Sequence, residues 1–455
     1  MIKRDDYKRI KKSNTRGKIL GGSSSLNYFI WSAIHHDYPN LYDPKFKKLG
    51  TSRPIPISRA KLISEMQPFR DALTMAWISR GVPTSENVYN GEMIGLTHCL
   101  DTIHNSQRPG SFLFVENNPN ITILSSVHSR RLIIDKATRA CTGVTMIAPT
   151  GAELNFYAIR EVIFSQGVFE TPKLLMLSGV GSAAELVKHS LDVVLVSRHV
   201  GQHLLEHPAV PFVLRVKDNF GMDDVLLRPS PRHDAVISAY RSNKEGPMGS
   251  GLLEMVGFPR IDENLNQDLD FVCMFGSAFQ WHFPTPKNGS YTSVVVDLVR
   301  PVPKGGEVTL NSADPLVQPN INLNFFADDL DTIAMREGVR WAYNLLLNGK
   351  GFKDIVIDQY PWNMPLDSDE AMKRAVLDRS QAAFHPCGTA RLCKNIDQGV
   401  VDPQLRVHSI KNLRAIDASI IPLIPDCRIQ NSVYMIGEEG ADIIKAQHSD
   451  LHKAL

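Results

Sequence analysis

The pattern of apolar residues changes twice along the chain, and this change constrains the fold more than any other feature. Glu161 to Phe164 reads as a buried strand, followed by a Ser-Gln-Gly turn and a helical stretch that ends at Gly179. This order is typical of α/β domains. Past Pro208 the sequence has strand-like runs separated by turns, and α/β character returns after Ala383. We therefore predict an α/β domain interleaved with a mostly antiparallel domain, α+β overall.

Several elements can be predicted from periodicity and capping signals. The expected strands of the middle region are Phe212–Val216, Leu269–Met274, Tyr291–Val299 and Val308–Leu310, and residues 120–134 read as β-rich. The expected helices are 59–81, one that opens with Thr171 as N-cap and Pro172 at its first position, 329–348, and 433–447. The helix expected over 329–348 should carry Leu330, Ile333, Ala334, Trp341, Ala342 and Leu345 on one face and stop at Gly349.

Composition narrows the class of protein. The 455 residues are too many for one core, and 43% apolar with 22% charged residues is typical of an ordinary globular protein. A net charge of +2 argues against a nucleic-acid or membrane surface, and no run approaches the ~18 apolar residues of a membrane span. The six cysteines form no CxxC, which gives no signal for zinc or a disulfide framework. No secretory signal follows Met1, so the compartment stays open.

Two glycine-containing stretches differ in what they predict. Gly179 to Ala184 formally fits the dinucleotide pattern GxGxxA, but a helix rather than a strand precedes it, so we interpret it as a helix stop and a new helix start. Gly17 to Asn27 instead contains paired glycines followed by three serines. Such a loop can lie against a flat or anionic ligand and donate N–H and O–H groups, although composition alone fits a flexible linker equally well.

The densest block of motifs lies near the C-terminus. His385 opens a His-Pro-x-Gly-Thr run, Asp417 and Ala418 lie in Leu-Arg-Ala-Ile-Asp-Ala-Ser, and a final apolar helix follows. Together with Gly17–Asn27 and a Thr-Pro-containing run from Gly167 to Gly181, this ordered set resembles the glucose–methanol–choline (GMC) family of FAD-dependent alcohol oxidoreductases. The resemblance runs from Gly17 to about Ile444.

This resemblance implies FAD as the cofactor and a small-molecule alcohol as the substrate. His385 would take the hydroxyl proton while the flavin accepts the hydride, a role that suits an imidazole. Arg428 stands where the family usually places a second His or an Asn, and we expect it to act as an electrostatic clamp, since arginine cannot serve as a base. The residues expected at the cofactor are Gly17, Leu20, Gly21, Gly22, Ser23, Ser24, Asn27, Asp417, Ala418 and Gln430. Metal ligands are not expected.

The chain also departs from the family pattern. His203 and Glu206 are substitutions in a run that resembles Gly-Gln-Asn-Leu-x-Asp-His-Pro, and we interpret His203 and His207 as structural. Only 16 residues precede Gly17, fewer than the ~30 of the expected strand–GxGxxG–helix unit that holds the ADP phosphates. Ile34 replaces a family glycine. The missing N-terminal unit and the break near Ile34 suggest truncation or a mis-joined gene model, so the FAD-binding domain is expected to be an incomplete Rossmann-like domain.

The expected domain organisation assigns residues 1–33, 109–208 and 384–455 to the FAD-binding domain, 34–108 to a cap on the substrate side, and 209–383 to the substrate-binding domain. Two alternatives to an alcohol oxidase or dehydrogenase remain open. One is a flavoprotein resembling hydroxynitrile lyases, and the other is a non-catalytic homologue that cannot hold FAD. A serine hydrolase is disfavoured because no GxSxG elbow occurs.

Overall fold

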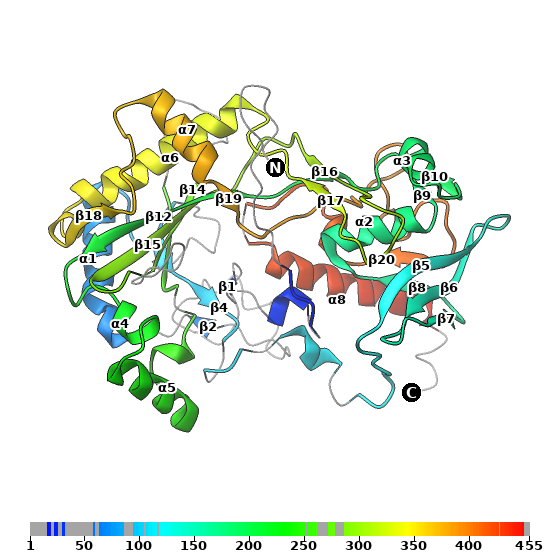
Figure 1. Ribbon diagram of the computed structural model, residues 1–455, viewed down its shortest axis with the longest axis horizontal. Helices are drawn as coiled ribbons and strands as arrows, with labels where there is room; N and C mark the ends of the chain where they lie inside the picture. The colour runs from blue at the N-terminus through cyan, green and yellow to red at the C-terminus, as the bar shows by residue number, and fades with distance from the viewer. Residues whose placement is uncertain are drawn as a thin grey trace.

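The computed structural model describes residues 16–19, 22–25, 30–31, 58–59, 63–85, 94–103, 106–108, 110–115, 118–251, 253–259, 261, 272–277, 286–426 and 428–449. These residues form two regions, each with its own hydrophobic core (Figure 1). One is built on a large antiparallel sheet, and the other has mixed α/β character with α8 (Gln430–Gln447) beside it. The predicted fold class, mixed α/β with mostly antiparallel sheets, is confirmed.

The large sheet has seven strands, of which six follow the order β18-β12-β15-β14-β13-β3, and β19 pairs with β12. Their bounds are β3 (Gly95–His98), β12 (Pro208–Val216), β13 (Met255–Phe258), β14 (Val272–Ser277), β15 (Ser290–Leu298), β18 (Val356–Tyr360) and β19 (Gln381–Ala382). All of their pairings are antiparallel. Helices α1 (Gln67–Ser79), α6 (Asp329–Asn348) and α7 (Asp369–Arg379) pack with this sheet (Figure 1).

Strand β12 is the central strand nearest the site described below. It is buried along nearly all its length, in keeping with its continuous apolar sequence. A proline inside a central strand removes a ladder hydrogen bond. Pro211 is tolerated here because it lies between the part of β12 that pairs with β19, Pro208–Ala209, and the part that pairs with β18, from Val213 onward. The N–H that Pro211 lacks would therefore point to the gap between β19 and β18, where β12 has no pairing partner on that side among the described residues.

The α/β region contains three small sheets. In the first, β8 (Val162–Phe164) runs parallel to β20 (Leu413–Ala415). In the second, β9 (Val180–Gly181) runs parallel to β10 (Leu195–Val196). The third is an antiparallel meander of β5 (His128–Asp135), β6 (Ala140–Ile147) and β7 (Glu153–Tyr157). Helices α2 (Gly167–Leu177) and α3 (Ala183–Lys188) connect them. The smaller elements β11 (Gln202–Leu204), β16 (Gly306–Thr309) and β17 (Asn320–Asn322) form a further sheet.

The remaining elements are short or lie at the periphery. They are η1 (Gly22–Ser25), β1 (Ile30–Trp31), β2 (Ser58–Arg59), η4 (Ser64–Met66), β4 (Leu100–Asp101), η6 (Ser111–Phe114), α4 (Asp223–Leu226), α5 (Pro231–Asn243), η7 (Pro247–Gly249), η8 (Phe352–Asp354) and η9 (Ala418–Ile420). Within the described part of the chain, no helix is long and apolar enough to cross a membrane.

The helix predicted to begin at Thr171-Pro172 begins at Gly167 instead, so that prediction was wrong. Asp417 Oδ2 accepts the Gly167 N–H at 2.9 Å and the Thr171 hydroxyl at 2.6 Å, and it thereby stabilises a first turn that the local sequence does not signal. Pro172 consequently lies inside the helix and leaves the carbonyl of Val168 without its usual N–H donor. The Thr389 hydroxyl donates to that carbonyl at 2.6 Å and replaces the lost bond.

Helix α6 has the predicted bounds and Gly349 as its C-cap, but its buried face is rotated. Leu330 and Ile333, which belong to the predicted apolar face, are 42% and 39% exposed. The Asp331 carboxylate accepts the Val302 N–H at 2.8 Å, which turns Asp331 toward the protein and these neighbours outward. The helix predicted over 59–81 is shorter, and the strand in the β-rich stretch begins only at His128. Gly179–Ala184 ends one helix and starts another, as predicted, with β9 between them.

Candidate active site

Strand pairing at one end of β12 brings His207 and His385 together. Residues 205–209 run antiparallel to residues 381–387, with Pro208 opposite Ala382 and Leu205 bridged to Cys387. The Ala383 N–H donates to the His207 carbonyl at 3.0 Å, which fixes the register. His207 Nδ1 then lies 3.0 Å from His385 Nδ1, and the two rings meet edge to face with 5.2 Å between their centroids. Residues 178 positions apart thus form one site.

Glu206 is buried beneath this histidine pair. Its Oε1 accepts the backbone N–H of His385 at 2.6 Å and that of His207 at 3.0 Å, so one carboxyl oxygen holds both histidine backbones. Its Oε2 lies 3.8 Å from Arg16 Nη2. Burial raises the pKa of Glu206 to about 8, although the Arg16 charge and the two N–H groups oppose that shift. The carboxyl is therefore able to carry a proton near neutral pH.

Both histidines of the pair are neutral at ordinary pH. Burial lowers the pKa of His207 to about 3, and the positive charge of Arg428 adds to that effect. The pKa of His385 is also well below its usual value because of burial, the neighbouring His207 ring, and the charges of Arg428 and Arg16. A neutral imidazole has one nitrogen with a lone pair, and this is the form in which histidine can accept a proton.

Arg428 places a positive charge beside the two histidines. Its Nη2 lies 3.3 Å from Asp297 Oδ2, and Asp297 sits on β15 opposite Ala209 of β12. Burial raises the pKa of Asp297 to about 6, with the Arg428 charge opposing the shift. The segment before Arg428 is held by Asp426, whose Oδ2 binds Arg300 Nη2 at 2.6 Å. The structure therefore brings the two predicted catalytic residues, His385 and Arg428, into one site.

The loop after His385 is closely packed. Gly388 has a φ of +96°, and a Cβ at this position would lie 2.3 Å from the carbonyl oxygen of His203. Only glycine fits such a position without strain. Next to it, Ala390 N donates to the Ser419 carbonyl at 2.8 Å, which joins this loop to η9. The His-Pro-x-Gly-Thr run thus connects the histidine pair to the Asp417–Ala418 segment.

The predicted cofactor residues fall into two groups. Gly22, Ser23 and Ser24 belong to η1, where the Gly17 N–H donates to Ser23 Oγ and the Ser111 N–H to Ser24 Oγ, both at 3.1 Å. Asp417 and Ala418 begin η9, and both carboxylate oxygens of Asp417 already accept hydrogen bonds within the protein. Leu20, Gly21 and Asn27 lie outside the described residues. Direct contact of these residues with a cofactor stays a prediction.

The N-terminus of α8 lies at the boundary between these groups. Gln430 is its first residue, and its N-cap, Ile429, provides no side-chain cap. The Tyr434 hydroxyl, one turn later, faces Ser24 and Gln430, and burial raises its pKa. An 18-residue helix with an uncapped N-terminus attracts groups with negative charge, and the serine hydroxyls add further donors. This donor set fits a flat, partly anionic ligand such as FAD.

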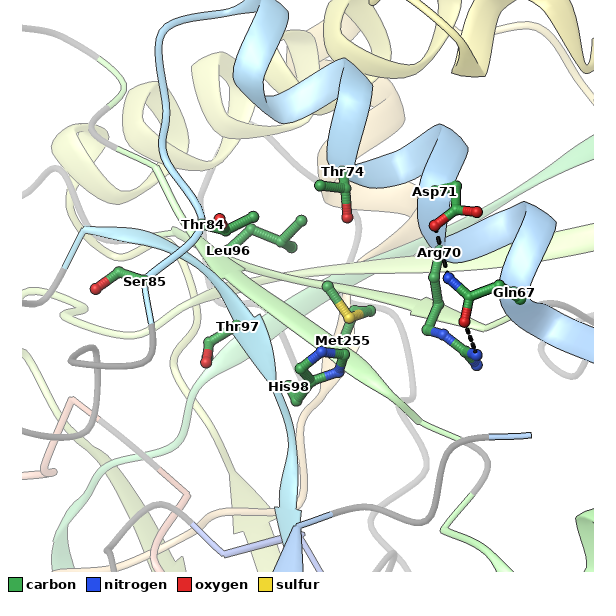
Figure 2. A pocket seen from close by; sticks show the side chains of 10 residues that line it. All are labelled: Gln67, Arg70, Asp71, Thr74, Thr84, Ser85, Leu96, Thr97, His98 and Met255. Carbon is green, nitrogen blue, oxygen red and sulfur yellow. Dashed lines mark hydrogen bonds between the residues drawn. The ribbon is translucent and has the colours of Figure 1, made fainter. Parts of the chain in front are cut away.

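The cavity shown in Figure 2 is separate from this site. It measures about 320 Å³ and lies between α1 and the edge strand β3. Gln67, Arg70, Asp71 and Thr74 face it from the helix, with Leu96, Thr97 and His98 on the strand (Figure 2). None of its lining residues belongs to the histidine–arginine site.

Sequence reasoning missed three parts of the site. The sequence pattern indicates a structural role for His207, marks Glu206 only as a substitution, and gives no signal for Asp297. The available signal was the Glu206-His207-Pro208 run, in which a carboxylate stands directly beside a histidine. Asp297 gave none, since it looks like any polar residue within an apolar strand.

Comparison with known proteins identifies the class. The chain matches the GMC oxidoreductase family over residues 11–209 and 301–437, and it belongs to that family. It is 27% identical to alcohol dehydrogenase [acceptor] of Pseudomonas putida, over 94% of this chain and 82% of that protein. It is also 27% identical to choline oxidase of Arthrobacter globiformis, over 95% and 81%. The protein is therefore an FAD-dependent oxidoreductase.

Among solved structures, formate oxidase is similar over nearly the whole chain. One crystal structure is 60% identical, with a TM-score of 0.94, and covers 99% of this chain and 88% of that one. A second, of formate oxidase from Aspergillus oryzae RIB40 with an arginine replaced by alanine to test the effect on FAD modification, is 59% identical at the same TM-score and coverage. These likenesses confirm the fold and the cofactor class.

Proposed function

We propose that this protein oxidises formate to carbon dioxide, with bound FAD as the hydride acceptor and oxygen as the final acceptor. The observation that carries this proposal is Arg428, a cation next to His385 where the family usually places a second His or an Asn. The 60% identity to formate oxidase over 99% of the chain supports the same substrate. The sequence-based prediction of an alcohol substrate becomes the second candidate.

Arg428 suits a small carboxyl group. A guanidinium presents parallel N–H donors that match the two oxygens of a carboxylate, which a second histidine or an asparagine cannot do. Asp297 forms an ion pair with this guanidinium and so helps to fix its orientation. The side chain of Arg428 is only 15% exposed. Water screens the charge of a largely buried arginine only weakly, so Arg428 attracts an anion more strongly than an exposed arginine would. A larger acid has the same carboxyl group, so the site's size rather than its charge would select formate.

His385 supplies the complementary function. Formic acid gives carbon dioxide when it loses a hydride from carbon and a proton from oxygen, and bound FAD supplies the hydride acceptor. The neutral imidazole of His385 accepts the proton from one carboxyl oxygen, and the two parallel N–H donors of Arg428 bind the carboxyl group. Formate anion can give carbon dioxide by losing its hydride alone, so a role for His385 as proton acceptor requires that the substrate enter as formic acid, or as formate together with a proton. In the proposed mechanism, one proton therefore enters with the substrate.

The pH dependence follows from this requirement. Because the pKa of His385 is lowered, its imidazole does not hold that proton in the free enzyme near neutral pH. The value of kcat/KM for formate should therefore fall about tenfold per unit as pH rises through the neutral range. An uncharged primary alcohol brings its own proton, so its kcat/KM should not fall in this way. A flat profile for formate would contradict the proposed proton uptake.

A small primary alcohol remains the second candidate, favoured by the relatives named alcohol dehydrogenase and choline oxidase. Its hydroxyl would donate to His385, and Arg428 would stabilise the alkoxide. Anaerobic mixing of the FAD-loaded protein with formate, with methanol or with an aryl alcohol distinguishes the candidates by which compound bleaches the flavin absorbance. If none does, the protein is not an oxidoreductase for these substrates, and a cyanohydrin would then test the lyase alternative.

Two substitutions test the assigned roles. We expect His385→Gln to lower kcat/KM by about 10²- to 10⁴-fold, the range of general acid–base catalysis. We expect Arg428→Lys to raise KM for formate by at least about tenfold, because a lysine cannot bind both oxygens. Arg374→Lys, on the exposed face of α7, is the matched control and should leave both constants unchanged. Unchanged formate kinetics in the His385 variant would refute its role as the proton acceptor.

A further inference from the structure

We propose that His207 is a positioning residue that fixes the tautomer of His385, so that the unprotonated Nε2 of His385 is the atom that takes the substrate proton. This inference rests on the proposed role of His385 in proton transfer. It concerns a residue that the sequence pattern had suggested was structural.

The contact between the two rings imposes a choice. The two Nδ1 atoms are 3.0 Å apart, which is a hydrogen-bond distance. Because both rings are neutral, one Nδ1 must carry a proton and the other must offer a lone pair. The protonation of one ring therefore determines that of the other. Which tautomer His385 adopts depends on which one His207 adopts.

The surroundings of His207 decide that choice. Its ring faces the backbone carbonyls of Val299 and Pro425, which favour a proton on it. His207 Nε2 is buried and makes no hydrogen bond with the residues that the structure describes, so the two carbonyls influence the ring without bonding to it. Carbonyls only accept, and Nδ1 is already engaged with His385. The proton of His207 is thus placed on Nε2, and its Nδ1 keeps the lone pair.

The consequence for His385 follows directly. Its Nδ1 must donate to His207 Nδ1, which leaves Nε2 of His385 without a proton and able to accept one. The opposite tautomer would place an N–H on Nε2, and His385 could then only donate to the substrate. A hydrogen bond on one ring nitrogen commonly determines the role of the other in this way.

Glu206 maintains the geometry on which this mechanism depends. One oxygen of its carboxyl group accepts both histidine N–H groups, and the His207 carbonyl accepts the Ala383 N–H. The backbones that carry the two rings are therefore fixed to each other. Arg428 and Arg16 lie near the pair and disfavour an imidazolium, so the neutral state persists until substrate binds.

The experiment compares His207→Phe with His207→Asn. Phenylalanine keeps a ring of similar size but offers no acceptor, whereas the asparagine amide oxygen can take the place of Nδ1. We expect His207→Phe to lower kcat for formate by at least about tenfold with little change in KM, because Arg428 still binds the carboxyl group. His207→Asn should recover most of that loss. Loss of kcat in both variants to the same extent would overturn the proposal.

Nitrogen-15 NMR of histidine-labelled protein provides a readout that does not depend on turnover. In the unsubstituted protein, we expect His385 to show a protonated Nδ1 and an unprotonated Nε2, and His207 the reverse. A protonated Nε2 on His385 would overturn the proposal even if the variants lose activity. If formate is not oxidised at all but the NMR pattern is as expected, the substrate proposal fails and the tautomer assignment stands.

A second histidine pair provides the matched control. His199 Nδ1 lies 2.8 Å from His203 Nε2, in a stacked pair outside the site, and His199 is half-buried. His199→Phe removes one ring of a histidine pair at a similar distance. We expect kcat, KM and the His385 nitrogen signals to remain unchanged in this variant. A change in the His385 signals would mean that their response is not specific to His207.

Discussion

Two buried glutamates, Glu254 beside α1 and Glu206 at the histidine pair, are each paired with an arginine, but the two pairs differ in how completely they are enclosed. Arg70 and Glu254 form a short ion pair, and their side chains are 6% and 1% exposed. Arg70 also donates to the Ile63 carbonyl, and Glu254 accepts the Ile63 N–H. Arg16 lies 3.8 Å from Glu206 and is 28% exposed.

The difference shows what each pair does. Around Glu254, charges and N–H groups are matched, so the pair joins α1 to the strand region near β13 and contributes to structure. At Glu206, one oxygen holds two backbone N–H groups, while Oε2 has no hydrogen bond within the described part of the chain. Its pKa of about 8 leaves it poised between two protonation states beside the proposed reaction site. The Arg70–Glu254 pair therefore stabilises the fold, whereas Glu206, next to Arg16, belongs to the candidate active site.

The largest effect should come from breaking the enclosed pair. We expect Arg70→Met to lower the free energy of unfolding by about 3–5 kcal/mol, because it leaves Glu254 buried without its counter-charge. The double variant Arg70→Met/Glu254→Leu should recover most of that loss, since apolar residues replace a buried pair well. Urea denaturation measures both. If the double variant is as unstable as the single one, the loss arises from packing rather than from the charge.

A pH-dependent effect is expected at the other glutamate. The pKa of Glu206 rises from its ordinary value of 4.5 to about 8 in the folded protein, so the stability associated with its protonated form is present below about 4.5 and is lost as pH rises through about 8. The amide that replaces the carboxyl group in Glu206→Gln cannot ionise. The melting temperature of this variant, relative to the unsubstituted protein, should therefore increase from pH 5 to pH 9.

Glu254→Gln serves as the comparison for that measurement. Burial also raises the pKa of Glu254, and the Ile63 N–H and the Arg70 charge oppose that shift. The melting temperature of Glu254→Gln should lie below that of the unsubstituted protein throughout the pH range, because the ion pair with Arg70 is lost. The difference between the two proteins should change less with pH than it does for Glu206→Gln. If the melting temperatures of Glu206→Gln and the unsubstituted protein differ by the same amount from pH 5 to pH 9, Glu206 does not titrate in this range.

The smallest effect should come from the open arginine. We expect Arg16→Gln to change the free energy of unfolding by less than about 1 kcal/mol, because Arg16 Nη2 lies 3.8 Å from Glu206 Oε2, beyond hydrogen-bond distance, and the Glu206 carboxyl can take up a proton when that charge is removed. Thermal unfolding at two salt concentrations measures it. A loss as large as that of Arg70→Met would show that the two pairs are energetically alike and would remove the contrast drawn above.

The sequence by itself determined the family and most of the elements. The order of strand-like and helical patterns predicted the interleaved architecture, and helix α6 was predicted with its observed bounds because its apolar spacing and cap are local signals. His385 and Arg428 were also predicted from the sequence, as residues in recognisable motif positions. Such signals are carried by neighbouring residues, which is why one sequence suffices to read them.

Only the tertiary structure decided how these residues act together. The start of α2 depends on Asp417, 250 positions from Gly167, and the partner of His385 depends on the pairing of residues 205–209 with 381–387. Burial then set the protonation of Glu206, His207 and His385, because desolvation depends on everything that surrounds a group rather than on its neighbours in sequence. The sequence predicted a base and a cation, His385 and Arg428, and long-range packing gave His385 its histidine partner and its neutral state.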